Sequence, residues 1–150
     1  MTKVRNGCGI LGVLACLAFA GEKKMQFQDL PPAVQKSVQD QTKGGEIKGI
    51  SKETEKGQTQ YEVETILNGK HRDINFDRMG TVVAVEEETT LDSLPAAART
   101  AIEKKVAGGK IATVETVTKG STVFYEAAYT SKNGRKHEVL VKADGTETKD

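Results

Sequence analysis

Two histidines and two cysteines are the side chains of this 150-residue chain that most often hold metal ions. His71 and His137 each lie just after an Asn-Gly pair, but no converging spacing of His, Cys or carboxylate ligands accompanies them. We therefore expect both histidines to be solvent-exposed residues at strand ends. Cys8 and Cys16 both lie in an apolar N-terminal stretch. The sequence predicts no metal site and no cofactor.

Four carboxylates near the first Asn-Gly pair could act as a general acid and base: Glu62, Glu64, Asp73 and Asp77. Such catalysis needs one carboxyl group that is desolvated beside a pocket. These residues instead occupy alternating polar positions of strand-like segments that also carry Lys70 and Arg72. We expect cross-strand charge pairs on a solvated sheet face. The run Glu86-Glu87-Glu88 similarly predicts a solvated linker.

Other features of the sequence also argue against catalysis and nucleic-acid binding. No Ser-His-Asp arrangement has a local signature, and the glycine pairs precede strands instead of opening helices, so they are poor phosphate-binding loops. Lys and Arg total 22 against 21 Asp and Glu, and tryptophan is absent. A nucleic-acid-binding protein usually has a clustered basic excess and stacking aromatic residues. The sequence predicts a protein that is not an enzyme and has no nucleic-acid partner.

The first twenty residues have the layout of a secretory signal peptide. Lys3 and Arg5 form a basic start, residues 8–20 are apolar, and Ala18-Phe19-Ala20 is a small-x-small cleavage motif. The apolar stretch is too short to span a bilayer comfortably. We therefore predict cleavage after Ala20 and export to the periplasm or the extracellular space. The mature chain would then have no cysteine and no transmembrane span.

A second interpretation of the same stretch is a lipid anchor. Val13-Leu14-Ala15-Cys16 resembles a bacterial lipobox, in which Cys16 would be acylated and become the new N-terminus. Both interpretations predict an exported protein.

Two hairpins organise the remainder of the chain. Residues 61–80 and 125–145 each open with Tyr-Glu, alternate in polarity, turn at Asn-Gly, alternate again and stop at a glycine that precedes a threonine. Asn68-Gly69 and Asn133-Gly134 are therefore predicted hairpin turns. A two-residue type I′ turn needs a positive φ angle at both positions, which Asn and Gly tolerate best.

A helix and another strand precede each hairpin. Leu30-Pro31-Pro32 predicts the start of a helix that ends at Gly44-Gly45, because proline suits a first helical turn and glycine commonly follows a helix. Residues 46–55 are predicted to form a strand. The second helix spans about 95–106, and a fourth strand is predicted in each half, at 81–87 and 146–150.

These elements recur at a fixed spacing. Leu94-Pro95 matches Leu30-Pro31 at an offset of 64, and from the Asn-Gly turns onward the offset is 65. We predict a 21–29 lead-in and two tandem repeats, 30–88 and 91–150. The predicted fold class is α+β, with one helix packed on a three- or four-stranded antiparallel sheet in each repeat. About sixty residues is marginal for an independent unit, so we expect the two repeats to pack together or to continue one sheet.

The order of short motifs in the first repeat resembles that of the PepSY-like family of small exported bacterial proteins. The matching residues are Leu30-Pro31-Pro32-Ala33-Val34, Gly44-Gly45-Glu46-Ile47, Tyr61-Glu62-Val63, Asn68-Gly69 and Phe76-Asp77-Arg78-Met79-Gly80. The second repeat departs from the pattern at Ala127 and at 141–145. The resemblance implies a fold like that of the proteinaceous β-lactamase inhibitors. It also implies distant kinship with propeptide modules that are suspected of restraining exported peptidases.

Two functions of different classes agree with these observations. In the first, the protein is an exported binding module that holds, and restrains, an exported enzyme such as a peptidase. Aromatic residues are enriched in interface cores, and the candidates here are Tyr61, Phe124, Tyr125 and Tyr129. In the second, the protein binds a small ligand or a cation in the cell envelope through the acidic segment 73–77.

Overall fold

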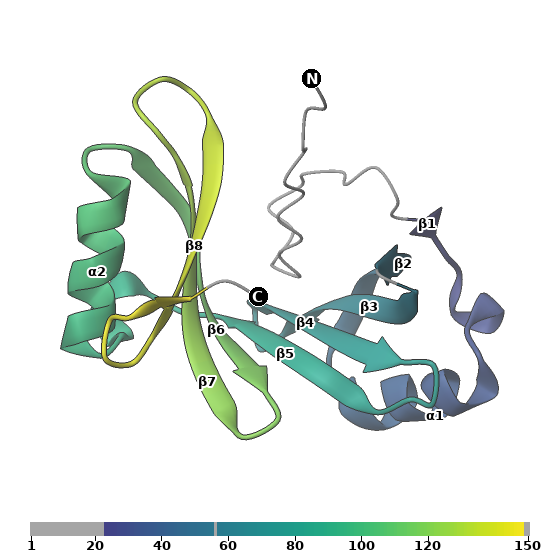
Figure 1. Ribbon diagram of the computed structural model, residues 1–150. Helices are drawn as coiled ribbons and strands as arrows, with labels where there is room; N and C mark the ends of the chain where they lie inside the picture. The colour runs from purple at the N-terminus through teal and green to yellow at the C-terminus, as the bar shows by residue number, and fades with distance from the viewer. Residues whose placement is uncertain (1–22, 56, 149–150) are drawn as a thin grey trace.

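The computed structural model describes residues 23–55 and 57–148 (Figure 1). The predicted signal peptide, 1–20, and the alternative lipidation site Cys16 lie outside the described residues. The first half of the chain contains β1 (Lys23–Lys24), a short 3-10 helix (Phe27–Asp29), α1 (Pro32–Gln41), β2 (Glu46–Glu55), β3 (Gln58–Leu67), β4 (Lys70–Asp77) and β5 (Val82–Glu88). The second half contains a short 3-10 helix (Leu91–Ser93), α2 (Ala96–Val106), β6 (Lys110–Lys119), β7 (Thr122–Thr130), β8 (Lys136–Lys142) and β9 (Glu147–Thr148).

The nine strands of the described residues form one antiparallel sheet, in which each strand pairs with the next along the chain. The predicted fold class, two repeats of one helix packed on a three- or four-stranded antiparallel sheet, is therefore wrong, because the described strands form one nine-stranded sheet. The expectation that the two halves would pack together or continue one sheet agrees with this pairing. The halves join where β5 pairs with β6, with Val85 opposite Thr118 and Glu88 opposite Glu115. Two separate sheets would have left β5 and β6 as edges with unpaired backbone groups, and their pairing removes both edges. The tandem duplication, 30–88 and 91–150, stays a prediction.

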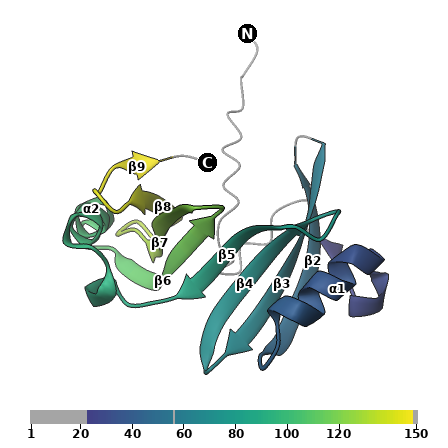
Figure 2. The same ribbon diagram turned by 90° about the horizontal axis from the view of Figure 1, so that it is seen from below.

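Both helices cover the same face of this sheet. Val85 of β5 packs against the core beneath α1, and directly opposite residues of paired strands share a face. The partner of Val85 is Thr118, and alternation along β6 places Val114 on the same face as Thr118. Val114 belongs to the core beneath α2. The helices lie at opposite ends of the molecule (Figures 1 and 2), and we call the opposite side of the sheet the helix-free face.

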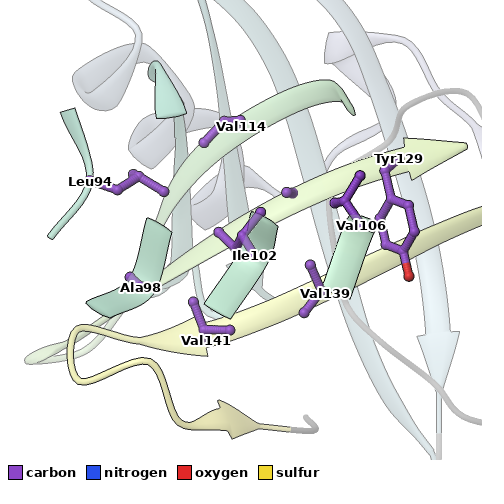
Figure 3. Close-up of a cluster of buried hydrophobic side chains, with 9 residues drawn as sticks. Leu94, Ala98, Ile102, Val106, Val114, Tyr129, Val139 and Val141 are labelled. Carbon is purple, nitrogen blue, oxygen red and sulfur yellow. The ribbon is translucent and has the colours of Figure 1, made fainter. Parts of the chain in front are cut away.

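Each helix packs a row of apolar side chains onto its end of the sheet. Beneath α2, Ala98, Ile102 and Val106 are buried at the predicted spacing of four residues, and they contact strands β6 to β8 (Figure 3). Beneath α1, Val34 and Val38 pack in the same way against strands β2 to β4. Neither helix of the described residues is long and apolar enough to cross a membrane.

The two Asn-Gly pairs form different turns. Asn68 and Gly69 have φ angles of 53° and 79°, so the predicted type I′ turn between β3 and β4 is confirmed. Only Gly134 has a positive φ in the second pair, and the β7–β8 loop takes in residues 131–135. There the Asn133 Oδ1 atom accepts hydrogen bonds from Ser131 Oγ at 2.6 Å and from the Arg135 backbone at 3.2 Å. The predicted two-residue turn at Asn133-Gly134 is therefore wrong, because side-chain hydrogen bonds stabilise a longer loop.

Candidate functional site

A run of carboxylates crosses the helix-free face from strand to strand. Glu64 of β3 lies opposite Asp73 of β4, which lies opposite Glu86 of β5. Glu88, two residues further along β5, lies opposite Glu115 of β6, which lies opposite Glu126 of β7. Directly opposite side chains have Cβ atoms about 5 Å apart, so like charges at these positions destabilise a sheet. We call these six residues the acidic strip: Glu64, Asp73, Glu86, Glu88, Glu115 and Glu126.

Most of the acidic strip is buried. The exposed fraction is 6% for Asp73, 2% for Glu86, 5% for Glu115 and 1% for Glu126. The predicted solvated sheet face is therefore wrong at Asp73, and the predicted solvated linker is wrong at Glu86, which is part of β5. A buried carboxylate is costly unless it is hydrogen-bonded, paired or protonated.

The basic residues expected to pair with these carboxylates lie on the other side of the sheet. Alternation along β4 places Lys70 and Arg72 on the helix-covered face, whereas Asp73 faces the opposite way. Arg72 Nε donates to Glu87 Oε1 at 3.1 Å, and a second guanidinium nitrogen donates to the Gln41 carbonyl at the end of α1. For this reason the predicted cross-strand pairing of Lys70 and Arg72 with the four carboxylates near the first Asn-Gly pair is wrong; Arg72 pairs across strands with Glu87 instead.

Glu115 is the residue of the strip whose ionisation is most strongly opposed. Burial and the negative charges of Asp73, Glu88, Glu138 and Glu62 raise its pKa to about 8. Those four carboxyl groups belong to four different strands, β4, β5, β8 and β3 in that order, and the negative charge of each opposes the ionisation of Glu115. At neutral pH the Glu115 side chain is therefore mainly protonated.

Asp73 is buried with one oxygen unsatisfied. Burial and the Glu64 carboxylate raise its pKa to about 6, although a hydrogen bond from the Thr65 backbone and the nearby His71 oppose the shift. Among the described residues, the buried Asp73 Oδ1 atom has no hydrogen-bond partner. The buried Thr113 hydroxyl, which register also places on the helix-free face, has none either. Buried polar atoms without a hydrogen-bond partner are rare in folded proteins, and strain, a chemical role or a bound water or ion accounts for those that occur.

Glu64 is accommodated by a glycine on the neighbouring strand. A Cβ atom at Gly49 would lie 2.9 Å from Glu64 Oε2, so the absence of a side chain there leaves room for the carboxylate. Gly49 lies beside an irregularity in the β2–β3 pairing. Nearby, Ser51 Oγ donates to Glu62 Oε2 at 3.4 Å. Strand β2 therefore helps to position the carboxylates of β3, through the space at Gly49 and the hydroxyl group of Ser51.

One of the four predicted binding residues lies on the helix-free face. Phe124 is half-buried there, opposite Val117 of β6 and Lys142 of β8. Tyr61 is buried in the core beneath α1, Tyr129 is buried in the core beneath α2, and Tyr125 packs against that second core. The structure does not bring the four aromatic side chains together.

The two histidines have different surroundings. The ring of exposed His137 stacks on Tyr129, with ring centroids 5.3 Å apart. His71 lines an open groove of about 440 Å³ beside the β3–β4 turn, together with Lys70, Arg72, Glu87 and Glu88. Within residues 23–55 and 57–148, no group of three or more His, Cys, Asp or Glu side chains is arranged to hold a metal ion.

The acidic segment 73–77 is divided between two roles. The Asp77 Oδ1 atom accepts hydrogen bonds from the backbones of Met79 and Thr81, at 2.8 and 2.9 Å, and so stabilises the β4–β5 turn. Asp73 lies four residues earlier in the strand, at a distance of about 13 Å for extended backbone. The two carboxylates therefore do not converge on one ligand.

Comparison with known proteins identifies the fold. No protein-family model matches the chain, and no curated protein matches it significantly. A Bacteroides eggerthii protein of inferred periplasmic location is similar in structure, with a TM-score of 0.65, 20% identity and coverage of 80% of this chain and 86% of that one. A DUF2874 family protein from Bacteroides ovatus has a TM-score of 0.61, 18% identity and coverage of 80% and 85%. A BLIP-like protein from Bacteroides fragilis has a TM-score of 0.57, 16% identity and coverage of 79% and 83%. The chain has a BLIP-like fold, that is, a fold like that of the proteinaceous β-lactamase inhibitors, as the family resemblance implied.

Proposed function

We propose that this protein is an exported, non-enzymatic binding module that holds a protein partner against the helix-free face of its sheet. The observation that carries the proposal is the acidic strip, because the buried carboxyl groups of Asp73 and Glu115, whose ionisation is opposed by burial and by neighbouring carboxylates, lower the stability of the free protein. Groups that destabilise a free protein are commonly retained where its function needs them. The partner would be an exported enzyme, such as a peptidase, whose activity the module restrains.

Two further observations support this proposal. The signal-like residues 1–20 favour export. The Bacteroides eggerthii relative is described as periplasmic, and the Bacteroides fragilis relative is described as BLIP-like. The helix-free face also carries a partly exposed aromatic residue beside its charges, since Phe124 is half-buried there, opposite Lys142. Mixed apolar and polar surfaces of this kind are typical of protein interfaces.

Capture of the partner tests the proposal. The protein would be cross-linked in intact cells that produce it naturally, and the products would be identified by mass spectrometry. We expect one exported enzyme to be recovered repeatedly, and its activity to fall when the purified mature protein is added. Recovery of no exported enzyme, or of one whose activity does not change, would contradict the proposed restraint.

A pair of neighbouring substitutions on β7 localises the interface. Phe124 lies on the helix-free face, and Val123, which is 40% exposed, points to the other face. We expect Phe124→Ala to reduce capture and inhibition at least about tenfold, as for an aromatic residue in an interface core. Val123→Ala is the matched control and should leave both unchanged. Equal effects of the two substitutions would exclude the helix-free face as the interface.

The mature N-terminus is a separate part of the proposal. We propose cleavage after Ala20, which leaves the lead-in 21–29 at the start of the chain; the alternative is an acylated Cys16. The mass of the protein purified from its native cells distinguishes the two. A chain that begins at Met1 would contradict both.

A further inference from the structure

We propose that the acidic strip binds an extended segment of the partner that presents several lysine or arginine side chains on one face. This inference rests on the proposed function and specifies the chemistry of the partner. It is carried by the arrangement of the carboxylates on the helix-free face and by an unsatisfied buried oxygen within them.

The charges of the helix-free face are segregated. Carboxylates occupy its centre, on β3 to β7, as directly opposed pairs. The basic residues that register places on the same face all lie at or next to strand ends: Lys24, His71, Lys110, Lys119, Lys136 and Lys142. The centre of the face is therefore negative and its margin positive, so a ligand with cationic groups fits the centre.

The second observation is Asp73. The residue is 6% exposed, and its Oδ1 atom is buried and has no hydrogen-bond partner among the described residues. Register places it between Glu64 and Glu86, in the β3–β5 half of the strip. A lysine ammonium or an arginine guanidinium supplies the missing donor and the missing positive charge together.

The length of the strip favours a chain of cations over a single ion. Neighbouring strands lie about 4.8 Å apart, so the four intervals from β3 to β7 span about 19 Å. In an extended segment, alternate side chains point to the same side and repeat every 6.6–6.8 Å or so, and about four of them cover this length. No described residues form a ready cluster for one metal ion.

The ionisation of the strip makes the binding dependent on pH. Burial and neighbouring negative charges raise the pKa of Glu115 to about 8 and that of Asp73 to about 6, and burial also raises the pKa of Glu138. A cationic ligand stabilises the ionised carboxylates, so binding releases protons. We expect the affinity to fall at least tenfold as the pH is lowered from 8 to 5.5.

The test uses a synthetic ten-residue peptide of alternating lysine and threonine and the full mature protein. Binding would be measured by calorimetry at pH 8 and low salt. Asp73→Asn with Glu115→Gln should weaken binding at least tenfold. The matched control, Asp92→Asn with Glu103→Gln, removes two carboxyl groups from exposed positions near or on α2 and should change the affinity less than twofold.

A second variant keeps the test valid if the first one does not fold. Glu64→Gln with Glu88→Gln alters the less buried members of the strip and should also weaken the binding of the peptide. The inference is overturned if the peptide does not bind, or if the strip variants and the control lose affinity equally. If a captured enzyme is still held by the Asp73→Asn, Glu115→Gln variant, this inference fails and the proposed function stands. If the peptide binds but no exported enzyme is captured, the proposed function fails.

Discussion

Glu115 shows how a single buried carboxyl group makes the stability of the free protein depend on pH. Its pKa is raised to about 8 in the folded protein, whereas a solvated glutamate has a pKa of about 4.5. Between these two values the folded state holds a proton that the unfolded state has released. The free energy of unfolding therefore falls as the pH rises from about 4.5 to about 8.

Glu115→Gln should remove this dependence. The substitution keeps the shape of the side chain but cannot ionise, so at pH 8 we expect a gain of about 2 kcal/mol, or roughly 6 °C in Tm. At pH 5 the two proteins should differ little. Thermal unfolding followed by circular dichroism measures both values, with the exposed Glu103→Gln as control. A Glu115→Gln variant that is no more stable than the parent at pH 8 would contradict the raised pKa of the buried Glu115 carboxyl group.

The sequence predicted the alternation of these residues but not their surroundings. Glu62, Glu64 and Asp73 were correctly placed on one side of their strands, since a strand alternates with period two. The juxtaposition of carboxylates across the middle of the sheet depends on the register between β5 and β6, which places Glu88 opposite Glu115. That pairing joins residues 27 apart in the chain, and no local pattern encodes it.

At the scale of elements, the short-range patterns were sufficient for most boundaries. Strand β2 has the predicted limits, and both helices begin within two residues of the Leu-Pro pairs. The exceptions have local physical causes. The two-residue strand β1 is too short to show alternation, and the β7–β8 loop is stabilised by the side chain of Asn133.

Two glycines with the same φ angle test how the turn after β4 contacts α1. Gly80 has φ +80°, and a Cβ atom there would lie 2.6 Å from the Ala33 carbonyl oxygen. Gly44 has φ +82° and no atom within 4 Å of that position. Gly44→Ala should cost about 1 kcal/mol from backbone strain, and Gly80→Ala about 3 kcal/mol because α1 must also move.

Urea unfolding of the two glycine variants provides this comparison. The Gly44→Ala variant serves as the control for strain alone. Equal losses in the two variants would show that α1 does not pack against the turn as described.

For the whole molecule, the continuous sheet predicts that the two halves unfold together. Ile102 is fully buried beneath α2, far from the core beneath α1 (Figures 1 and 3). Ile102→Ala should cost about 3 kcal/mol. Because β5 pairs with β6, we expect the slowest-exchanging amides of β3 to lose as much protection as those of β7.

Hydrogen exchange measures the coupling directly. The exposed Thr100→Ala substitution on the same helix is the control and should change little. Faster exchange confined to β6, β7 and β8 would mean that the halves unfold independently, as two separate units would.

The architecture of the whole molecule was only partly predictable. The resemblance in the motifs of residues 30–80 implied the BLIP-like fold, and that implication agrees with the structural relatives. The assignment of a three- or four-stranded sheet to each repeat was wrong, because hydrophobic patterning defines strands and faces but not which edge strands pair.

The most direct test of the account is to locate the peptide on the folded protein. Amide chemical shifts of the mature chain would be recorded by NMR while the lysine–threonine peptide is added at pH 8. We predict the largest changes at Asp73, Glu86, Glu115 and their neighbours on β4 to β7, with α1 and α2 little affected. Changes centred on the helices, or on the groove beside the β3–β4 turn, would contradict binding at the helix-free face.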